Sequence, residues 1–344
     1  MTVVIAAAIV MAGATPAFAH SVAGSGATNY KTTLRRVSPS IPGVHLQVIE
    51  AGSRLELSYS GDRTIYVLGY VQEQYLRIDE RGVFENLNSP ATYINKTRNG
   101  VTPPGDVDPR KAPRWQKVTG GTIARWHDHR VHFMGDINPR PVRAAPGERH
   151  VIQPDWQVPI TDGTTTAVAH GDLVWVPGPS AAPYLLLALA LALVMLAIGR
   201  GTSPFLPVGI ATAVIVVMDI AHSVAIGFAN GGSTATKFAQ TFAASIVSVP
   251  AWLVGAGAVW FLLRRRIDGF FAAVFTGLIV AVVGGIADVS NLSRSQVPFA
   301  VLPMSWSRPI VAVSLGLGFG VALASGLAIR RLDPKPAAQL TSPE

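Results

Sequence analysis

Apolar residues are distributed differently in the two halves of the chain. Between residues 30 and 177, short segments alternate apolar and polar positions and are separated by turn residues, as in VHLQVIEA (44–51) and RLELSYS (54–60). A period of two is the pattern of a half-buried strand, and many short strands at close spacing are typical of an antiparallel sandwich. We therefore expect an extracytoplasmic antiparallel β-sandwich over residues 20–178.

The same pattern continues through the rest of this half. QYLRIDERGVFEN (74–86) predicts a hairpin that turns at Glu80-Arg81-Gly82. Residues 88–114 are rich in Pro, Asn, Gly and Arg, which predicts a long loop over one end of the sandwich. The other predicted strands lie in TIYVLGY (64–70), GTIARWHDHRVHF (121–133), HVIQPDWQVPI (150–160) and TTTAVAHGDLVWV (164–176).

Long apolar runs dominate the second half, after a linker at 179–183. A helix rises 1.5 Å per residue, so each run is about long enough to cross roughly 30 Å of hydrocarbon, although the first is short. We expect a transmembrane domain of five helices over residues 184–331, followed by a tail at 332–344. The five runs are 184–199, 204–226, 238–263, 270–289 and 309–329.

Basic residues indicate the orientation of these helices. If the N-terminal domain lies outside the cell, then Arg200, the run Arg264–Arg266 and the pair Arg330–Arg331 all lie inside. Cytoplasmic loops are enriched in Lys and Arg, so this arrangement follows the positive-inside rule. The sequence therefore predicts a cell-membrane protein with its N-terminal domain outside and its C-terminus in the cytoplasm.

Composition narrows the class of protein. Hydrophobic residues make up 49% of the chain and charged residues 14%, which is low for a soluble protein. The net charge is +8, but the basic residues flank apolar runs and form no patch interleaved with aromatics, so we expect no nucleic-acid partner. The chain has no cysteine, which excludes disulfides, thiolate zinc sites and copper sites with a Cys ligand.

Residues 1–19 have the pattern of a signal peptide. An apolar run ends in Ala17-Phe18-Ala19, which matches a small-x-small cleavage site, although no basic residue precedes the run. Cleavage there makes His20 the N-terminal residue of the mature protein. The alternative is an uncleaved membrane anchor.

Three of the eight histidines lie in ARWHDHRVHFMG (124–135). If this segment is one strand, His127 and His129 share a face and His132 points to the other. An H-x-H pair can give two imidazole nitrogens to one metal, although surface strands also carry such pairs by chance. His20 would add its amine and its ring nitrogen. Such a nitrogen-rich set suits Cu(II), and zinc, which prefers a tetrahedral site, is the less favoured alternative.

These features together resemble the copper-binding exported subunit of particulate methane and ammonia monooxygenases. The resemblance covers the cleavage site before His20 and RWHDHRVHFMG about a hundred residues later. It implies a cupredoxin-like domain, within the wider class of immunoglobulin-like sandwiches, with His20, His127 and His129 as copper ligands. That subunit has two soluble domains and two membrane helices, whereas this chain is expected to have one soluble domain and about five helices. Oxygenase activity is therefore not implied here. The overall layout also resembles an uncharacterised type of actinobacterial membrane protein.

Neighbouring residues have alternative interpretations. His132 would be an extra or outer ligand if the strand bulges after Arg130, and otherwise a solvated histidine, which we favour. Asp128 would be an outer partner of the metal, or would pair with Arg130 or with a neighbour across the sheet. Met134 is a possible soft ligand for Cu(I), although a lone Met is more often part of a core.

Ionisable residues also occur inside the apolar runs. Asp219 and His222 lie three apart, on one face of the second predicted helix, while Asp288 and Gln240 lie near the outer ends of neighbouring helices. Such residues often mark a functional path, so the four define a possible intramembrane metal or proton site. The equal alternative is a polar cluster that pairs helices.

The residues therefore favour one function and leave two others open. The first is a copper-binding envelope protein that binds, stores or delivers copper. The second is a copper-dependent oxidase or oxygenase, or a subunit of one, and the third is a metal-free structural or assembly protein. Expected partners are the lipid bilayer and either a copper donor or acceptor or other membrane subunits.

Overall fold

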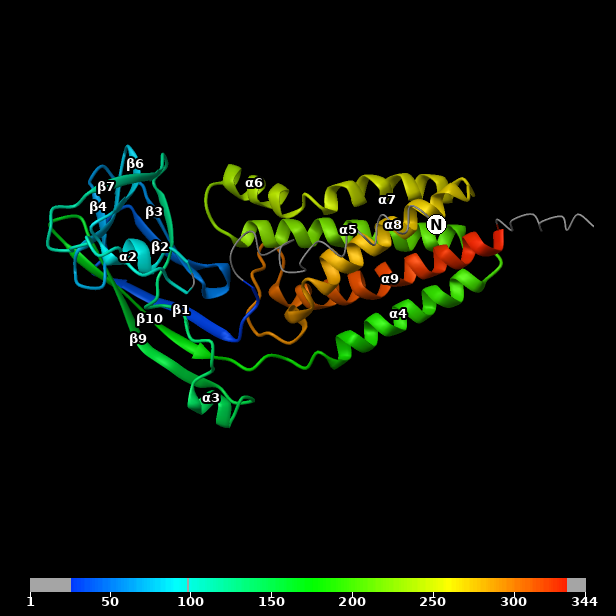
Figure 1. The fold of residues 1–344 in the computed structure, drawn as a ribbon, viewed down its shortest axis with the longest axis horizontal. Helices are drawn as coiled ribbons and strands as arrows, with labels where there is room; N and C mark the ends of the chain where they lie inside the picture. Colours follow the sequence, from blue (N-terminus) through cyan, green and yellow to red (C-terminus); the bar gives the residue numbers. More distant parts are fainter. Residues whose placement is uncertain (1–25, 98, 333–344) are drawn as a thin grey trace, which may run out of the picture.

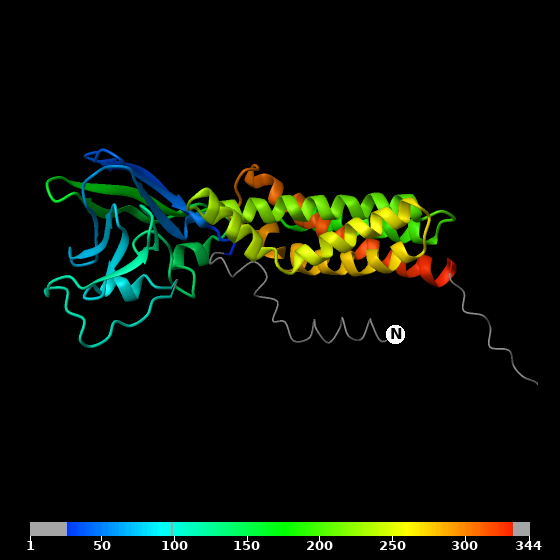
Figure 2. The ribbon, with the colours of Figure 1, turned by 90° about the horizontal axis from the view of Figure 1, so that it is seen from above.

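The protein has two parts in the computed structural model, which describes residues 26–97 and 99–332 (Figure 1). A domain of two antiparallel β-sheets comes first, and a helical region follows it. Figure 2 shows that the two parts lie end to end along the long axis of the molecule. The predicted signal peptide, His20 and nearly all of the predicted tail lie outside the described residues.

The β domain contains one sheet of seven strands and one of three, and all of their pairings are antiparallel. The larger sheet has the order β1 (Tyr30–Ser38), β10 (Thr166–Trp175), β9 (His150–Thr161), β4 (Ile65–Leu68), β5 (Gln74–Asp79), β6 (Gly82–Asn86) and β7 (Trp115–Thr119). The smaller sheet has the order β2 (Val44–Ile49), β3 (Arg54–Tyr59) and β8 (Ile123–His127).

Apolar residues of both sheets form one core. Apolar side chains at alternate positions of β3, β4 and β9 are buried in it, and they include Leu55, Leu57 and Trp156. The hairpin predicted at 74–86 is confirmed as β5 and β6. Within the loop predicted at 88–114, a short helix, α2 (Pro90–Ile94), begins where the Ser89 side chain accepts a hydrogen bond from the N–H of Ala91. The other short elements are η2 (Glu50–Gly52) and α3 (Arg140–Ala144).

Among the described residues, four helices are long and apolar enough to cross a membrane, and a fifth span results if one bent pair of helices is counted as a unit. The helical region as a whole contains these spans and several shorter elements. In chain order they are α4 (Ala182–Arg200), α5 (Phe205–Ala229), α6 (Thr234–Ala244), α7 (Ser248–Leu263), α8 (Asp268–Val280), a π-helical continuation of α8 (Ala281–Ile286), η4 (Val289–Leu292), η5 (Met304–Trp306) and α9 (Ser307–Leu332).

The single helix predicted at 238–263 is wrong, because α6 and α7 meet there at an angle of 72°. Ser245 ends α6, and its hydroxyl donates to the Thr241 carbonyl at 2.7 Å. Pro250 lies in the first turn of α7. Proline has no N–H for a continuing helix but is well accommodated in a first turn, so the chain starts a new helix here.

Glycines let α9 approach its neighbours closely, as the G-x-x-x-G spacing of Gly316 and Gly320 predicts. A Cβ on Gly316 would lie 2.7 Å from Ala188 Cα in α4, and one on Gly320 would lie 2.7 Å from Met195 Cβ in the same helix. Gly318, between them, faces Ala281 at the end of α8 in the same way. Backbone therefore packs against backbone along α9.

Several polar contacts join the two parts. Thr28 forms an isolated antiparallel bridge with Gln296, and Asn29 Oδ1 accepts a 2.8 Å hydrogen bond from the backbone N–H of Ser295. On another side, the guanidinium of Arg125 in β8 donates to the Asn230 carbonyl at 2.9 Å. The loops after α5 and α8 are thereby attached to the β domain.

Candidate functional site

The histidine-rich segment is the end of a strand followed by a tight turn. β8 ends at His127, and the carbonyl of Asp128 then accepts a hydrogen bond from Val131 N at 3.0 Å. The Asp128 carboxylate accepts from the backbone and guanidinium of Arg130 and from Trp126 Nε1 at 3.0 Å. Asp128 is fully buried. Its carboxylate therefore holds the turn, and the expected pairing with Arg130 is confirmed at 2.7 Å.

The strand predicted at 121–133 is therefore too long, and the expected grouping of the histidines is wrong. Side chains alternate only in an extended chain, whereas the turn after His127 reverses the path. His132 is brought back so that its ring centroid lies 5.9 Å from that of His127 and 5.3 Å from that of His129. It is also buried, contrary to the solvated state expected for it. The turn thus gathers three imidazoles where strand geometry predicts two.

Each of the three rings makes a hydrogen bond to a backbone carbonyl through one nitrogen. A carbonyl can only accept, so that nitrogen carries the proton and the lone pair lies on the other one. The bonds run from His127 Nδ1 to Ser53 O at 3.0 Å, from His129 Nε2 to Thr97 O at 3.1 Å and from His132 Nδ1 to Asp128 O at 3.0 Å.

The environment also keeps two of these rings neutral. Burial, and then the positive charge of Arg54, lower the pKa of His127 to about 4. Burial likewise lowers the pKa of His129. Arg54 Nε donates to the lone pair on His127 Nε2 at 3.1 Å. Neutral imidazole is the form that binds metal ions, and here Arg54 lies where a metal would approach His127.

No group of three or more His, Asp or Glu side chains in residues 26–97 and 99–332 is arranged to hold a metal ion. His20 lies outside these residues, so the proposed set of His20, His127 and His129 stays a prediction. A small cavity beside His132 is also lined by Gly26, the first described residue, and by Ser53. Met134 is half-buried, two residues beyond His132.

The polar residues of the helices form two pairs. His222 Nε2 and Asp288 Oδ2 lie 2.8 Å apart, and they join α5 to the segment after α8. Trp252 Nε1 in α7 donates to Asp219 Oδ2 at 2.7 Å. Asp219 Oδ1 is buried without a hydrogen-bond partner among the described residues, and it lies beside Gly284 in the π-helical segment. π-helical turns are frequent at functional sites.

The fourth predicted member of this cluster makes no hydrogen bond to either pair among the described residues. Gln240 is on α6, and its Oε1 has no hydrogen-bond partner within the described part of the chain. Sequence reasoning missed Arg54 and Trp252. An indole N–H in an apolar helix needs an acceptor, so Trp252 could have been paired with Asp219 from composition alone. Arg54 carries no such signal.

Comparison with models of protein families, with curated proteins and with solved structures finds no match for this chain.

Proposed function

We propose that the protein binds copper in the cell envelope, at a site built from the histidine turn and the mature N-terminus. The observation that carries this proposal is the hydrogen-bonding pattern of His127, His129 and His132. Histidines that bind metals almost always donate their other ring N–H to a carboxylate or a backbone carbonyl, which fixes the tautomer. All three rings make such a bond, and the ring of His132 lies within 6 Å of each of the other two.

His20 is within reach of this turn. His20 lies six positions before Gly26, which lines the same small cavity as His132. Six extended residues span at most about 20 Å. A mature N-terminal His20 would add its amine and its ring nitrogen, so that the ligand set would be nitrogen-rich and would suit Cu(II) better than zinc. His132 then becomes a candidate ligand alongside His127 and His129.

We further propose that the β domain is a cupredoxin- or immunoglobulin-like sandwich and that the helices cross the cell membrane. Only 17% of an 18-residue apolar stretch of α4 is buried, so most of this helix is available to lipid. Exposed tryptophans lie toward opposite ends of the bundle, Trp306 before α9 and Trp260 near the end of α7, as expected of interfacial aromatic belts.

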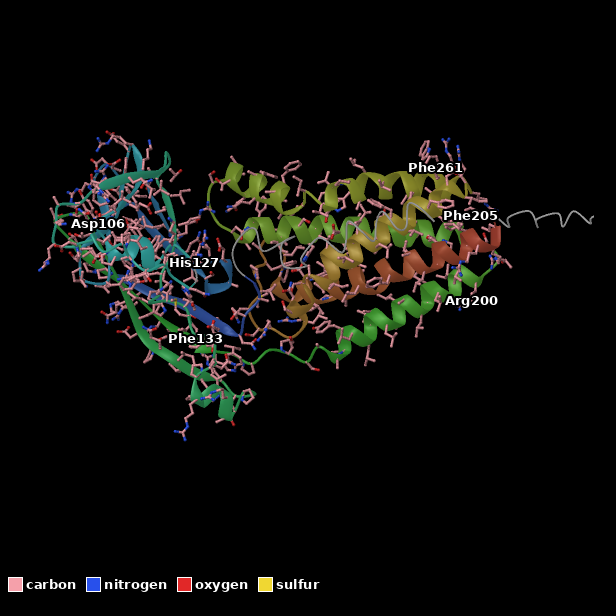
Figure 3. The ribbon with its side chains drawn as sticks, in the orientation of Figure 1. Asp106, His127, Phe133, Arg200, Phe205 and Phe261 are labelled. Carbon is pink, nitrogen blue, oxygen red and sulfur yellow. The ribbon has the colours of Figure 1, made fainter. Side chains whose placement is uncertain are left out.

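The basic ends of the helices support an external β domain. Arg200 lies at the end of the bundle remote from the β domain (Figure 3). There the guanidinium of Arg331 donates to the carbonyls of Arg200 and Gly201. Because cytoplasmic loops are enriched in basic residues, this end is proposed to face the cytoplasm.

The decisive experiment combines N-terminal sequencing of the mature full-length protein with copper titration and electron paramagnetic resonance. We expect a chain that begins at His20 and binds one Cu(II) through nitrogen ligands. Loss of an outer partner of a metal site typically weakens binding about 10–100-fold, so His127→Ala, or one residue added before His20, should cost at least as much.

His45→Ala is the matched control, because His45 is an exposed histidine on β2, and it should leave the affinity unchanged. Comparison of His129→Ala with His132→Ala identifies which of the two is a ligand. Unchanged copper affinity in all of these variants would refute the site and leave the metal-free structural alternative.

A further inference from the structure

A cavity of about 530 Å³ lies between the two sheets and the start of α6. Figure 3 shows that His127, which lines it, lies on the side of the β domain facing the helices. Cavities of about 300–1,000 Å³ are typical of small-molecule sites. Its wall includes the aromatic residues Tyr75 and Trp126 and the polar residues Ser233 and Thr236.

Positive charge predominates among the lining side chains. Arg54, Lys96 and Arg125 line the cavity, against one carboxylate, Glu85. Arg54 is offset by Glu50 at 3.3 Å. Lys96 and Arg125 make no ion pair with a described carboxylate, although Arg125 donates to a backbone carbonyl. Burial raises the pKa of Glu85, and the positive charge of Lys96 opposes this shift. The cavity therefore favours an anion.

A buried donor in the wall also lacks an acceptor. Asn95 is 4% exposed, and its side chain interacts with Tyr75, but its Nδ2 meets no acceptor at good hydrogen-bond geometry among the residues described. The orientation of the amide is fixed, because Oδ1 accepts from Tyr70 Oη at 2.5 Å and from His129 N at 3.4 Å. An unsatisfied buried donor is unfavourable, and a ligand with acceptor oxygens would satisfy it.

The start of α6 adds a further contribution. Ser233 caps this helix of 11 residues by accepting a hydrogen bond from Thr236 N. The N-terminus of a helix carries a partial positive charge, which stabilises anions. Both residues line the cavity.

We propose that this cavity binds a small molecule that carries a carboxylate or phosphate group. Lys96 and Arg125 supply the charge, Asn95 Nδ2 donates to an anionic oxygen, and Trp126 forms an apolar wall. This site requires no copper, so a negative result for copper binding would not contradict it.

The test is calorimetric titration of copper-free, full-length protein in nanodiscs of neutral lipid, with citrate and inorganic phosphate as separate probes. We expect saturable one-site binding of at least one probe. A hydrogen bond to a charged group contributes about 1.5–3 kcal/mol, so Lys96→Glu should weaken binding by at least about tenfold. Lys96 is exposed, so this change buries no charge.

Lys111→Glu is the matched control, since Lys111 is an exposed lysine outside the cavity lining. This variant should bind the probes as the parent protein does. A second pair tests the volume rather than the charge. Gly121 lines the cavity and Gly120 does not, and a Cβ on either would meet nothing within 4 Å. Gly121→Leu should weaken binding, and Gly120→Leu should not.

The absence of saturable binding of both probes at millimolar concentration would overturn the proposal. The proposal would also be overturned if Lys96→Glu and Lys111→Glu weakened binding equally and Gly121→Leu and Gly120→Leu did so too. Binding would then not depend on the residues that line the cavity.

Discussion

Arg54 Nε donates a 3.1 Å hydrogen bond to His127 Nε2, on the nitrogen that would have to bind a metal. The same nitrogen of Arg54 lies 3.3 Å from the buried carboxylate of Glu50. A cation thus lies on the side from which a metal ion would approach His127, and copper bound as proposed would have to displace it.

Replacement of Arg54 should therefore tighten copper binding. Arg54→Met keeps much of the side-chain volume but removes the donor and the charge, so the lone pair of His127 becomes accessible. We expect the Cu(II) dissociation constant to fall by about tenfold, which corresponds to about 1.4 kcal/mol, the scale of one hydrogen bond to a charged group. Arg35→Met, which removes an exposed arginine paired with Asp155, is the control. If Arg54→Met binds no tighter than the control, Arg54 does not block the site.

Glu50 should make stability depend on pH. Burial outweighs the attraction of Arg54 and raises the pKa of Glu50 to about 7, against 4.5 for an unburied group. The stabilising effect of the neutral carboxyl is complete below about pH 4.5 and is lost as pH rises through 7, since the unfolded chain ionises first. Each pKa unit corresponds to about 1.4 kcal/mol, so the upper limit of the loss is about 3 kcal/mol.

The measurement compares denaturant unfolding of the parent and Glu50→Gln at each pH, so that other titrations cancel. Because Gln cannot ionise, the stability of the Glu50→Gln variant relative to the parent should rise between pH 4.5 and 7.5. A difference that does not change with pH would show that Glu50 titrates normally.

The contact between Asp219 and Trp252 should stabilise the packing of α5 on α7. Asp219→Leu leaves the indole N–H without its acceptor, whereas Asp219→Asn retains an acceptor oxygen. We expect Asp219→Leu to lower the free energy of unfolding in detergent by about 1–2 kcal/mol and Asp219→Asn to have little effect. A double-mutant cycle with Trp252→Phe should give a coupling of roughly 0.6–1.7 kcal/mol. Zero coupling would mean that the pair contributes nothing.

Close packing of α4 on α9 can be tested with two glycines of the same helix. A methyl group on Gly316 would overlap the backbone of Ala188, while one on Gly326 would meet nothing within 4 Å. Gly316→Ala should lower stability by about 1–3 kcal/mol, as overpacking typically does. Gly326→Ala should be neutral or stabilising by up to about 1 kcal/mol, because Ala has the higher helix propensity. Equal thermal shifts would contradict this packing.

The sequence by itself predicted the two-part organisation, most strands and most helix ends. These features depend on local periodicity, which a single segment displays without its neighbours. Leu55 and Leu57 alternate with polar residues and are buried, and α9 (Ser307–Leu332) contains its predicted run at 309–329. The glycine spacing of α9 also predicted close packing, because small residues permit it whatever the partner is.

Only the tertiary structure decided which histidines meet. Strand parity separated His132 from His127 and His129, but the Asp128 carboxylate closes a turn that gathers all three. The partners of these rings, Ser53, Arg54 and Thr97, are distant in sequence and were brought there by pairing of strands and by the loop after α2. The cavity between the two sheets and the start of α6 likewise depends on packing between elements. Periodicity describes one element at a time, whereas a site depends on contacts between several.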